Sequence, residues 1–187
     1  MKVALLSGGV GGARFACGLV SAVDPADVTV IGNVGDDLDV LGLAVSPDLD
    51  SILYALAGLH DEERGWGRAG ETWEALGTVA ALGGEDWFRL GDRDLGLHLV
   101  RSQALRAGEP LSAVTRRLAQ ALGVEAAILP ATDDRLRTWI TRRPAASRFR
   151  SGSSPAAIAT RSTAFASRAM RSPRPVCSRP WPEPTRS

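Results

Sequence analysis

The sequence predicts an α/β fold in which a parallel sheet carries a helical insertion and a disordered C-terminal tail follows. Two short apolar runs, at residues 2–7 and 28–31, flank residues 13–23, whose apolar side chains recur at helical spacing. Short buried strands joined by a helix favour parallel pairing with a right-handed crossover. A third apolar run, at residues 126–129, indicates that the same sheet continues later in the chain.

The helical insertion lies between the second and third expected strands. Ser46 and Pro47 predict a helix start, because serine and proline are favoured at the beginning of a helix and the acids beside them complement its dipole. Apolar periodicity predicts helices at residues 49–56, 71–82, 95–107 and 111–122. All of these elements fall within residues 1–141, which we expect to form one domain.

Residues 142–187 differ in composition from the domain before them. Residues 1–141 hold 12 Lys and Arg against 20 Asp and Glu, a net charge of −8, whereas residues 142–187 hold 10 Arg against one Glu, a net charge of +9. Arg, Ala, Ser and Pro make up 34 of these last 46 residues, and seven prolines would interrupt any regular element. We therefore expect a disordered tail.

Cysteine usage and hydropathy narrow the class of protein. Cys17 and Cys177 belong to no CxxC motif or Cys/His cluster, so neither a disulfide framework nor a zinc site is expected. The N-terminal apolar run is too short for a signal peptide, and no stretch approaches the ~20 apolar residues of a membrane span. We expect a cytoplasmic protein without a membrane partner.

A glycine cluster separates the first expected strand from the first helix. In LLSGGVGGARF, the residues Gly8, Gly9, Gly11 and Gly12 would let backbone N–H groups approach an anion, which the helix dipole also favours. No Lys-Ser/Thr pair follows as in a P-loop, and Arg14 replaces the third glycine of the dinucleotide fingerprint. The cluster predicts either a phosphate site or merely a tight turn.

An acidic segment follows the second expected strand. Residues 31–52 contain five carboxylates and no Lys, Arg or His. Because ligands gather beyond the carboxyl ends of parallel strands, we expect Asn33, Asp36 and Asp37 to lie beside the glycine cluster. Carboxylates beside a phosphate site favour an intervening Mg²⁺ ion. The alternative is structural: Asp36 and Asp37 cap a turn, and Asp48 caps a helix.

A third polar group lies in LGDRDLGLHLVRSQALRAG. Asp92 and Asp94 flank Arg93 in a turn. His98 and Arg101 follow, one helical turn apart. A helix that aims His and Arg at a site could bind phosphate or a carboxylate. The alternative is an ordinary amphipathic helix with its charges in solvent.

Five segments, standing together and in this order, resemble a known family. They are SGGVGGAR at 7–14, NVGDD at 33–37, SPDLDSILYALAG at 46–58, LGDRDLGLHLVRSQALRAGEPLS at 90–112 and ILPATDDRLRT at 128–138. They are similar to the 2-phospho-L-lactate transferase family of coenzyme F-420 biosynthesis, which has an actinobacterial phosphoenolpyruvate transferase branch. The resemblance covers residues 1–141, roughly the N-terminal half of a family member.

The resemblance implies a Rossmann-like sheet and a Mg²⁺-dependent transfer. A guanosine diphosphate-linked lactate or enolpyruvate would donate its phospholactyl or phosphoenolpyruvyl group to the hydroxyl of the deazaflavin Fo, and GMP would be released. The glycine cluster would bind the donor diphosphate, and Asp48 and Asp50 would bind the metal and act in catalysis. The same resemblance implies a homodimer for the full-length protein. The substrate-binding residues that it implies are Asn33, Asp36, Asp37, Asp92, His98 and Arg101.

The resemblance stops after about residue 138, so a truncated domain is expected. Family members continue with a QEW-like segment and later a GPSNP loop, and this chain has neither. Permitted codons for residues 150–155, read one nucleotide earlier, encode Gln-Glu-Trp-Phe-Val-Ala, which is compatible with a frameshift. We expect residues 142–187 to be out of frame and the chain to be impaired or inactive, with a natural basic tail as the alternative.

Two other classes of protein are alternatives. The first is a Rossmann-like nucleotide-binding protein of another type, although the imperfect glycine pattern and the lack of an acid at the ribose position argue against it. The second is a basic-tailed nucleic-acid-binding protein, although no aromatic residues interleave with the arginines. The second class predicts salt-dependent affinity that disappears when residues 142–187 are removed.

Overall fold

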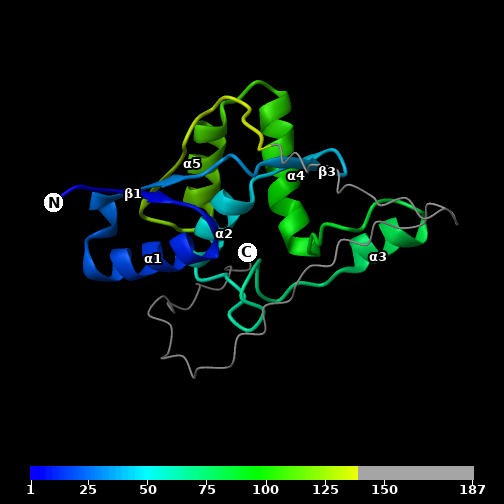
Figure 1. Ribbon diagram of the computed structural model, residues 1–187, viewed down its shortest axis with the longest axis horizontal. Coiled ribbons are helices and arrows are strands. Elements are labelled where there is room, and N and C mark those ends of the chain that lie inside the picture. Colours follow the sequence, from blue (N-terminus) through cyan, green and yellow to red (C-terminus); the bar gives the residue numbers. More distant parts are fainter. Residues whose placement is uncertain (139–187) are drawn as a thin grey trace, which may run out of the picture. The chain divides into compact units, whose positions relative to one another are not determined.

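The computed structural model describes residues 1–138, which contain a three-stranded parallel sheet (Figure 1). The strands are β1 (Val3–Ser7), β2 (Val28–Gly32) and β5 (Ala127–Pro130), in the order β1-β2-β5. The predicted parallel α/β sheet with a helical insertion is confirmed. The predictions of a disordered tail and of a frameshift concern residues 142–187, which lie outside the described residues.

Helix α1 (Gly9–Ala22) begins at Gly9 rather than at Ala13, where the apolar spacing places its start. The glycine cluster is therefore the first turn of the helix and not a loop before it. Glycine has a low helix propensity, which hides this turn from sequence analysis. Because the first N–H groups of a helix have no intrahelical partner, this end of α1 offers donors at the carboxyl end of β1.

A short antiparallel hairpin, which the sequence analysis missed, follows β2. Its strands are β3 (Leu38–Val40) and β4 (Leu43–Val45). Leu41 and Gly42 form the turn, with φ angles of 51° and 74°. Two positive φ angles are typical of a type I′ hairpin turn, whose usual first residue is Asn, Asp or Gly. Three-residue strands and a leucine in the turn leave no recognisable signal.

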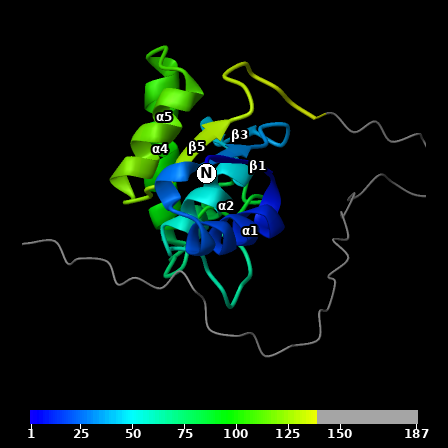
Figure 2. The ribbon, with the colours of Figure 1, turned by 90° about the vertical axis from the view of Figure 1, so that its left-hand side faces the viewer.

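Helices α1 and α2 (Pro47–Leu56) pack side by side on one side of the sheet, and α5 (Leu111–Ala121) packs against β5 (Figure 2). The core that they share includes Val28, Val30, Leu49, Ile52, Leu53, Val114, Leu118 and Ile128. This packing brings the N-termini of α1 and α2 to the carboxyl end of β2. A 3-10 turn (Pro25–Asp27, η1) leads into β2 at its other end.

Helices α3 (Glu74–Ala81) and α4 (Asp92–Arg106) have reciprocal N-terminal caps: an acid at the start of α4 caps α3, and an acid that precedes α3 caps α4. The Asp92 carboxylate accepts two hydrogen bonds of 3.0 Å from backbone N–H groups in the first turn of α3. The Glu71 carboxylate accepts two, of 2.8 and 3.0 Å, from the first turn of α4. A carboxylate at a helix N-terminus satisfies donors and complements the dipole. The caps explain why α3 begins later, and α4 earlier, than the apolar spacing predicts.

The other ends of the predicted helices agree closely with the structure. Within residues 1–138, no helix is both long enough and apolar enough to cross a lipid bilayer.

Replacing Thr115 with valine should stabilise the domain. Thr115 on α5 is fully buried, and its hydroxyl has no hydrogen-bond partner among the described residues. T115V keeps the shape of the side chain and removes an unsatisfied polar group, so the free energy of unfolding should rise by about 1 kcal/mol. Urea unfolding followed by circular dichroism measures this change.

The matched control is T78V, because the Thr78 hydroxyl is exposed and donates a 2.9 Å hydrogen bond to the Glu74 carbonyl. This change should leave stability within about 0.5 kcal/mol of the original. A T115V protein that is less stable than the original chain would contradict the prediction.

Candidate functional site

The Asp48 carboxylate joins three elements at the carboxyl end of the sheet. Asp48 lies in the first turn of α2 and is buried. Its Oδ1 accepts a 2.8 Å hydrogen bond from the backbone N–H of Gly9, and its Oδ2 accepts one of 2.8 Å from Nδ2 of Asn33. The structure thus brings Asn33 close to the glycine cluster, as its position after β2 predicts. Asp48, in α2, joins the two, and its position after β4 did not predict this.

Backbone geometry explains three of the four glycines. A Cβ on Gly8 would lie 3.1 Å from the carboxylate described above, and one on Gly12 would overlap the Ser7 hydroxyl. Gly9 has a φ of 64°, which residues with a side chain rarely adopt. Gly11 is exposed, and a Cβ there would meet no atom within 4 Å. The space beside Gly11 is therefore open to a ligand.

Asp50 enters a buried ion pair with Arg101 of α4. Arg101 donates from Nη1 to Oδ2 of Asp50 at 3.1 Å and from Nη2 to Oδ1. Arg101 is fully buried, and Asp50 is 5% exposed. Burial disfavours the charge on Arg101, but the Asp50 carboxylate raises the pKa of the guanidinium above its ordinary value. This two-point contact holds α2 against α4.

Tyr54 and Asp94 extend this buried network. The sequence analysis placed Asp94 in a turn and predicted neither residue to be part of the site. The Tyr54 hydroxyl donates to Oδ1 of Asp94, which lies 3.2 Å from Nε2 of the buried His98. Burial raises the pKa of Tyr54, and the charges of Asp50 and Asp94 raise it further. Burial acts to raise the pKa of Asp94, but its contacts with His98 and Tyr54 hold it below its ordinary value.

A spacing signal in the sequence could have found this network. Asp94, His98 and Arg101 stand at positions i, i+4 and i+7 of α4 and share one face. Asp50 and Tyr54 stand at i and i+4 of α2. His98 and Arg101 therefore act beneath the site, not on its surface.

Asp37 is a partly buried acid whose pKa is raised above its ordinary value. The Ser46 hydroxyl donates a 2.8 Å hydrogen bond to Oδ2 of Asp37, while Oδ1 is buried and has no partner among the described residues. Burial raises the pKa of Asp37 to about 6. The Ser46 hydrogen bond and the Arg101 charge oppose this rise, and the Asp50 and Asp48 charges add to it.

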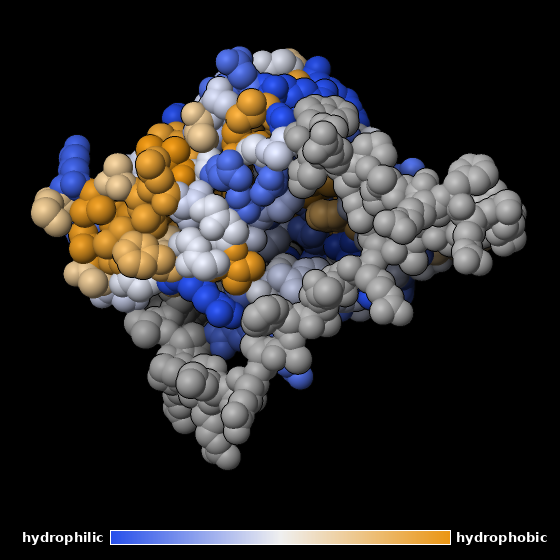
Figure 3. Space-filling model, in the orientation of Figure 1, coloured by the Kyte–Doolittle hydropathy of each residue, from blue (hydrophilic) through white to orange (hydrophobic). Residues whose placement is uncertain are grey.

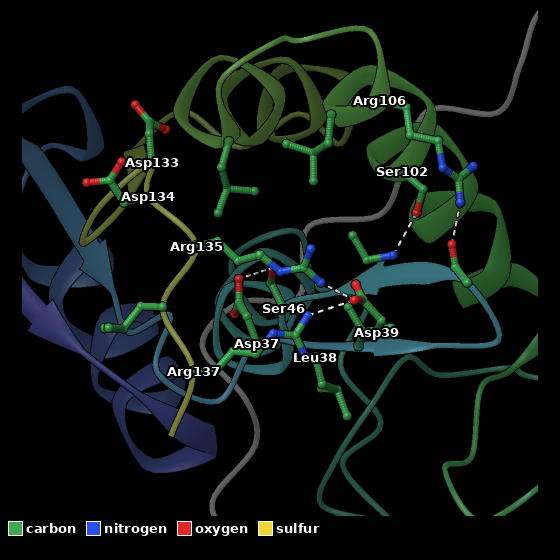
Figure 4. A pocket seen from close by; sticks show the side chains of 16 residues that line it. Asp37, Leu38, Asp39, Ser46, Ser102, Arg106, Asp133, Asp134, Arg135 and Arg137 are labelled. Atoms are coloured by element: carbon green, nitrogen blue, oxygen red, sulfur yellow. Dashed lines mark hydrogen bonds and ion pairs between the residues drawn. The ribbon is translucent and has the colours of Figure 1, made fainter. Parts of the chain in front are cut away.

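A cavity of about 500 Å³ lies beside Asp37 (Figure 4). The β3–β4 hairpin, α4 and the segment after β5 line it. Arg135 and Arg137 converge on Asp39 within the lining, with Nη2 of Arg137 at 2.7 Å from Oδ2. Arg106 also lines the cavity, and its guanidinium donates to a backbone carbonyl of the hairpin. Guanidinium and carboxylate groups in one cavity suit a polar ligand.

Two of the predicted substrate-binding residues, Asp36 and Asp92, are not part of the buried network of Asp50 and Arg101. Asp36 is exposed. The Asp92 carboxylate accepts hydrogen bonds from Thr72 and from the first turn of α3. These contacts lower the pKa of Asp92 below its ordinary value, mainly through the Thr72 hydroxyl. The geometry gives Asp92 a capping role in the insertion.

Distant arginines pair with two of the five carboxylates of the acidic segment. Arg101 pairs with Asp50, and Arg135 and Arg137 pair with Asp39. Within residues 1–138, no group of three or more His, Cys, Asp or Glu side chains could hold a metal ion.

The two predicted metal ligands differ in how well they fit that role. Asp50 does not fit, because its carboxylate forms an ion pair with the buried Arg101 guanidinium, whose positive charge would repel a metal ion. Asp48 fits as a single carboxylate ligand, because a carboxylate oxygen keeps a second lone pair after it accepts one hydrogen bond.

These residues define an α/β protein with a polar site at the carboxyl ends of its parallel strands. The model of the family described as 2-phospho-L-lactate transferase CofD matches residues 3–148, and the chain belongs to this family. The resemblance inferred from the five sequence segments is confirmed.

Similar proteins include several actinobacterial enzymes. The chain is 50% identical over 141 residues to the phosphoenolpyruvate transferases of Streptomyces avermitilis and Streptomyces coelicolor. It is 51% identical over 140 residues to that of Nocardia farcinica (strain IFM 10152). These matches cover 75%, 75% and 74% of this chain and 44%, 44% and 42% of the relatives. The chain therefore spans less than half the length of the curated relatives that it matches.

Removing one partner of the Asp50–Arg101 pair should destabilise the domain strongly. D50N or R101M leaves a buried polar group without its partner, at a cost of about 3–5 kcal/mol. Residues in such contact should show a coupling energy of about 0.5–3 kcal/mol when the D50N/R101M double variant completes the cycle. Urea unfolding of the four proteins measures this energy.

The control is R135M, which removes one exposed partner of Asp39. An exposed pair contributes less than about 1 kcal/mol. Equal destabilisation by R101M and R135M would show that the Asp50–Arg101 pair is not buried in solution.

The stability of the domain should depend on pH through Asp37. Because its pKa is raised from 3.8 to about 6, the folded chain keeps this proton at pH values where the unfolded chain has lost it. Stability from this group is therefore present below pH 3.8 and declines as pH rises toward about 6. D37N removes this titration. The free energy of unfolding of D37N minus that of the original chain should therefore rise between pH 3.8 and about 6, and then level off.

Urea midpoints of both proteins at several pH values measure this difference, in which the titrations of the other groups cancel. Parallel curves for the two proteins, with no change in separation, would contradict the raised pKa.

Proposed function

We propose that this chain carries the donor-binding part of a transferase of coenzyme F-420 biosynthesis. The reaction would move a phosphoenolpyruvyl or phospholactyl group from a guanosine diphosphate-linked donor to the hydroxyl of the deazaflavin Fo, with release of GMP. The observation that carries the proposal is the convergence of α1, Asn33 and Asp48 in a chain of this family. The relatives named above are phosphoenolpyruvate transferases, which favours the enolpyruvyl donor.

In this proposal, the donor diphosphate binds at the N-terminus of α1. The helix dipole and the N–H groups of the first turn favour an anion there. Asp48 already accepts from the Gly9 N–H, so we assign the diphosphate to the turn around Gly11, where space is open. The Ser7 hydroxyl is buried beside Gly12 and has no partner among the described residues, so it supplies a further donor.

We assign the acceptor Fo to the side of the site that holds Asn33, Asp36 and Asp37. A cavity of about 500 Å³ beside Asp37 has the size of small-molecule pockets. His98 and Arg101 support this side from beneath, because Arg101 holds Asp50 and α2 in place.

The proposed transfer depends on position and charge more than on covalent help from the protein. The hydroxyl oxygen of Fo bonds to the phosphorus that bears the enolpyruvyl or lactyl group, and the bond from that phosphorus to GMP breaks. Asp37 is suited to accept the hydroxyl proton, because its pKa of about 6 lies close to neutral pH. Asp48 fixes the helix that binds the donor, and Asp50 acts through Arg101 as a positioning residue.

Mg²⁺ belongs to this proposal with Asp48 as its protein ligand. Mg²⁺ in proteins prefers one or two carboxylates together with substrate phosphate oxygens and water, so a single carboxylate suffices. When bound, the ion would neutralise charge on the donor diphosphate. The proposal also retains the cytoplasmic location and the homodimer of full-length members that were expected from the sequence.

A methyl group at Gly11 should block donor binding without harm to the fold. G11A adds a Cβ that meets no protein atom within 4 Å, and alanine in place of glycine in a helix adds about 0.5–1 kcal/mol of stability. If the diphosphate binds at this turn, the affinity for GDP in the presence of Mg²⁺ should fall at least about tenfold. Calorimetric titration of the whole 187-residue chain with GDP measures this affinity.

The matched control is G18A, since Gly18 lies about two turns further along α1 and a Cβ there also meets nothing within 4 Å. G18A should gain similar stability and keep the original affinity. Failure of the original chain to bind GDP, or equal affinities of G11A and G18A, would refute the donor site. Binding that is unchanged without Mg²⁺ would remove the metal from the proposal and leave the donor site.

A further inference from the structure

Two arginines converge on one carboxylate oxygen in the wall of the cavity beside Asp37. Nη2 of Arg135 and Nη2 of Arg137 both donate to Oδ2 of Asp39, the second at 2.7 Å (Figure 4). Both arginines belong to the segment after β5, whereas Asp39 belongs to β3. Two guanidinium groups that meet at one point form a site for an oxyanion, because each presents a fork of donors that matches carboxylate and phosphate oxygens.

Asp39 is held weakly at this oxyanion site. Its side chain is 49% exposed, and those of Arg135 and Arg137 are 68% and 31% exposed. Ion pairs that are exposed to this extent contribute little to stability, because water screens the charges and the side chains lose rotamer freedom. A ligand that carries a charged oxygen can therefore displace Asp39 at small cost.

Other acids of the cavity lining do not compete for the two arginines. Asp133 accepts at 2.6 Å from the backbone N–H and at 2.9 Å from the hydroxyl of Ser112, at the start of α5. Oδ2 of Asp37 accepts from the Ser46 hydroxyl. Figure 4 shows the Asp134 carboxylate turned away from the arginine pair. Among the described residues, Asp39 is therefore the acid that holds this pair.

Apolar side chains form much of the remaining wall of the cavity: Leu38, Ala44, Val45, Leu105, Leu111 and Leu136. On the visible face of the molecule, hydrophilic residues gather where α4 ends and where the segment after β5 lies in Figure 1 (Figure 3). A cavity of about 500 Å³ with an apolar wall and a charged rim suits an organic acid, whose body fills the cavity while its oxyanion meets the arginines.

The proposed reaction supplies such an acid as its product. In that reaction, the acceptor hydroxyl loses its proton and gains a phosphodiester that carries the enolpyruvyl or lactyl carboxylate. The product therefore has two negative charges at a position where the acceptor has none. An oxyanion site in the cavity assigned to the acceptor distinguishes the product from the acceptor.

We propose that Arg135 and Arg137 bind the acidic group that the transfer adds to the acceptor, and that Asp39 is an internal competitor that promotes release of the product. This inference rests on the proposed function and adds a product site to it. When Asp39 holds the arginines, they are closed to the product, so the apparent affinity falls in proportion to the fraction of chains in which the pair is free.

Phosphoenolpyruvate is a direct probe of this site, because it carries the same carboxylate and a phosphate without the acceptor. Phosphorus NMR titration of the whole 187-residue chain measures its affinity. R137M removes one guanidinium and should lower this affinity at least about tenfold, since hydrogen bonds between charged groups are strong. D39N removes the competitor and should raise the affinity about two- to fivefold, the range that an exposed ion pair allows.

The matched controls are R117M and E109Q. Arg117 and Glu109 form a 2.7 Å ion pair whose side chains are 49% and 40% exposed, and neither residue lines the cavity. These variants change the net charge by the same amounts as R137M and D39N, and they should leave the affinity unchanged. Circular dichroism of the four variants checks that each folds.

Equal affinities in R137M and R117M, or in D39N and E109Q, would overturn the proposal. A chain that binds GDP but not phosphoenolpyruvate would overturn it as well and would leave the donor site in place. Loss of phosphoenolpyruvate binding in G11A but not in R137M would place the anion at the glycine cluster and also overturn it. The expected changes in R137M and D39N without any GDP binding would support the arginine site and refute the donor site.

Discussion

The site depends on one buried carboxylate, that of Asp48, which accepts from two segments that are distant in the sequence. Gly9 at the start of α1 and Asn33 after β2 both donate to it at 2.8 Å. A charge-assisted hydrogen bond is stronger than a neutral one, and a buried donor left without its acceptor is costly. Asp48 therefore fixes the first turn of α1 against α2, and the open space beside Gly11 lies on that turn.

A second layer of polar contacts supports this arrangement from beneath. Asp50 lies two residues after Asp48 on the same helix, and its pairing with the buried Arg101 ties α2 to α4. Two acids of this segment, Asp39 and Asp50, thus pair with arginines 51 residues or more away along the chain. Burial raises the pKa of Asp37 to about 6, and its buried Oδ1 has no hydrogen-bond partner among the described residues.

Several features of the fold and site could be predicted from the sequence. The strand–helix–strand order, the insertion and the closeness of Asn33 to the glycine cluster follow from apolar periodicity and from the rule that ligands gather at the carboxyl ends of parallel strands. The start of α1 was placed too late, because glycine masks the first turn. The β3–β4 hairpin was missed, because three-residue strands carry too little pattern. The contacts of Tyr54 and Asp94 in the buried network were missed, although their spacing on α2 and α4 matches that of their partners.

The sequence by itself determined the elements, their order and the family, because apolar spacing and short motifs are local properties of the chain. The tertiary structure alone decided which partner each carboxylate has. Asp48 and Asp50 share a helix turn, yet one faces the N-terminus of α1 and the other faces Arg101. The helical rotation of about 100° per residue turns these two side chains to different neighbours, and only the packing of α1 and α4 around α2 supplies those neighbours.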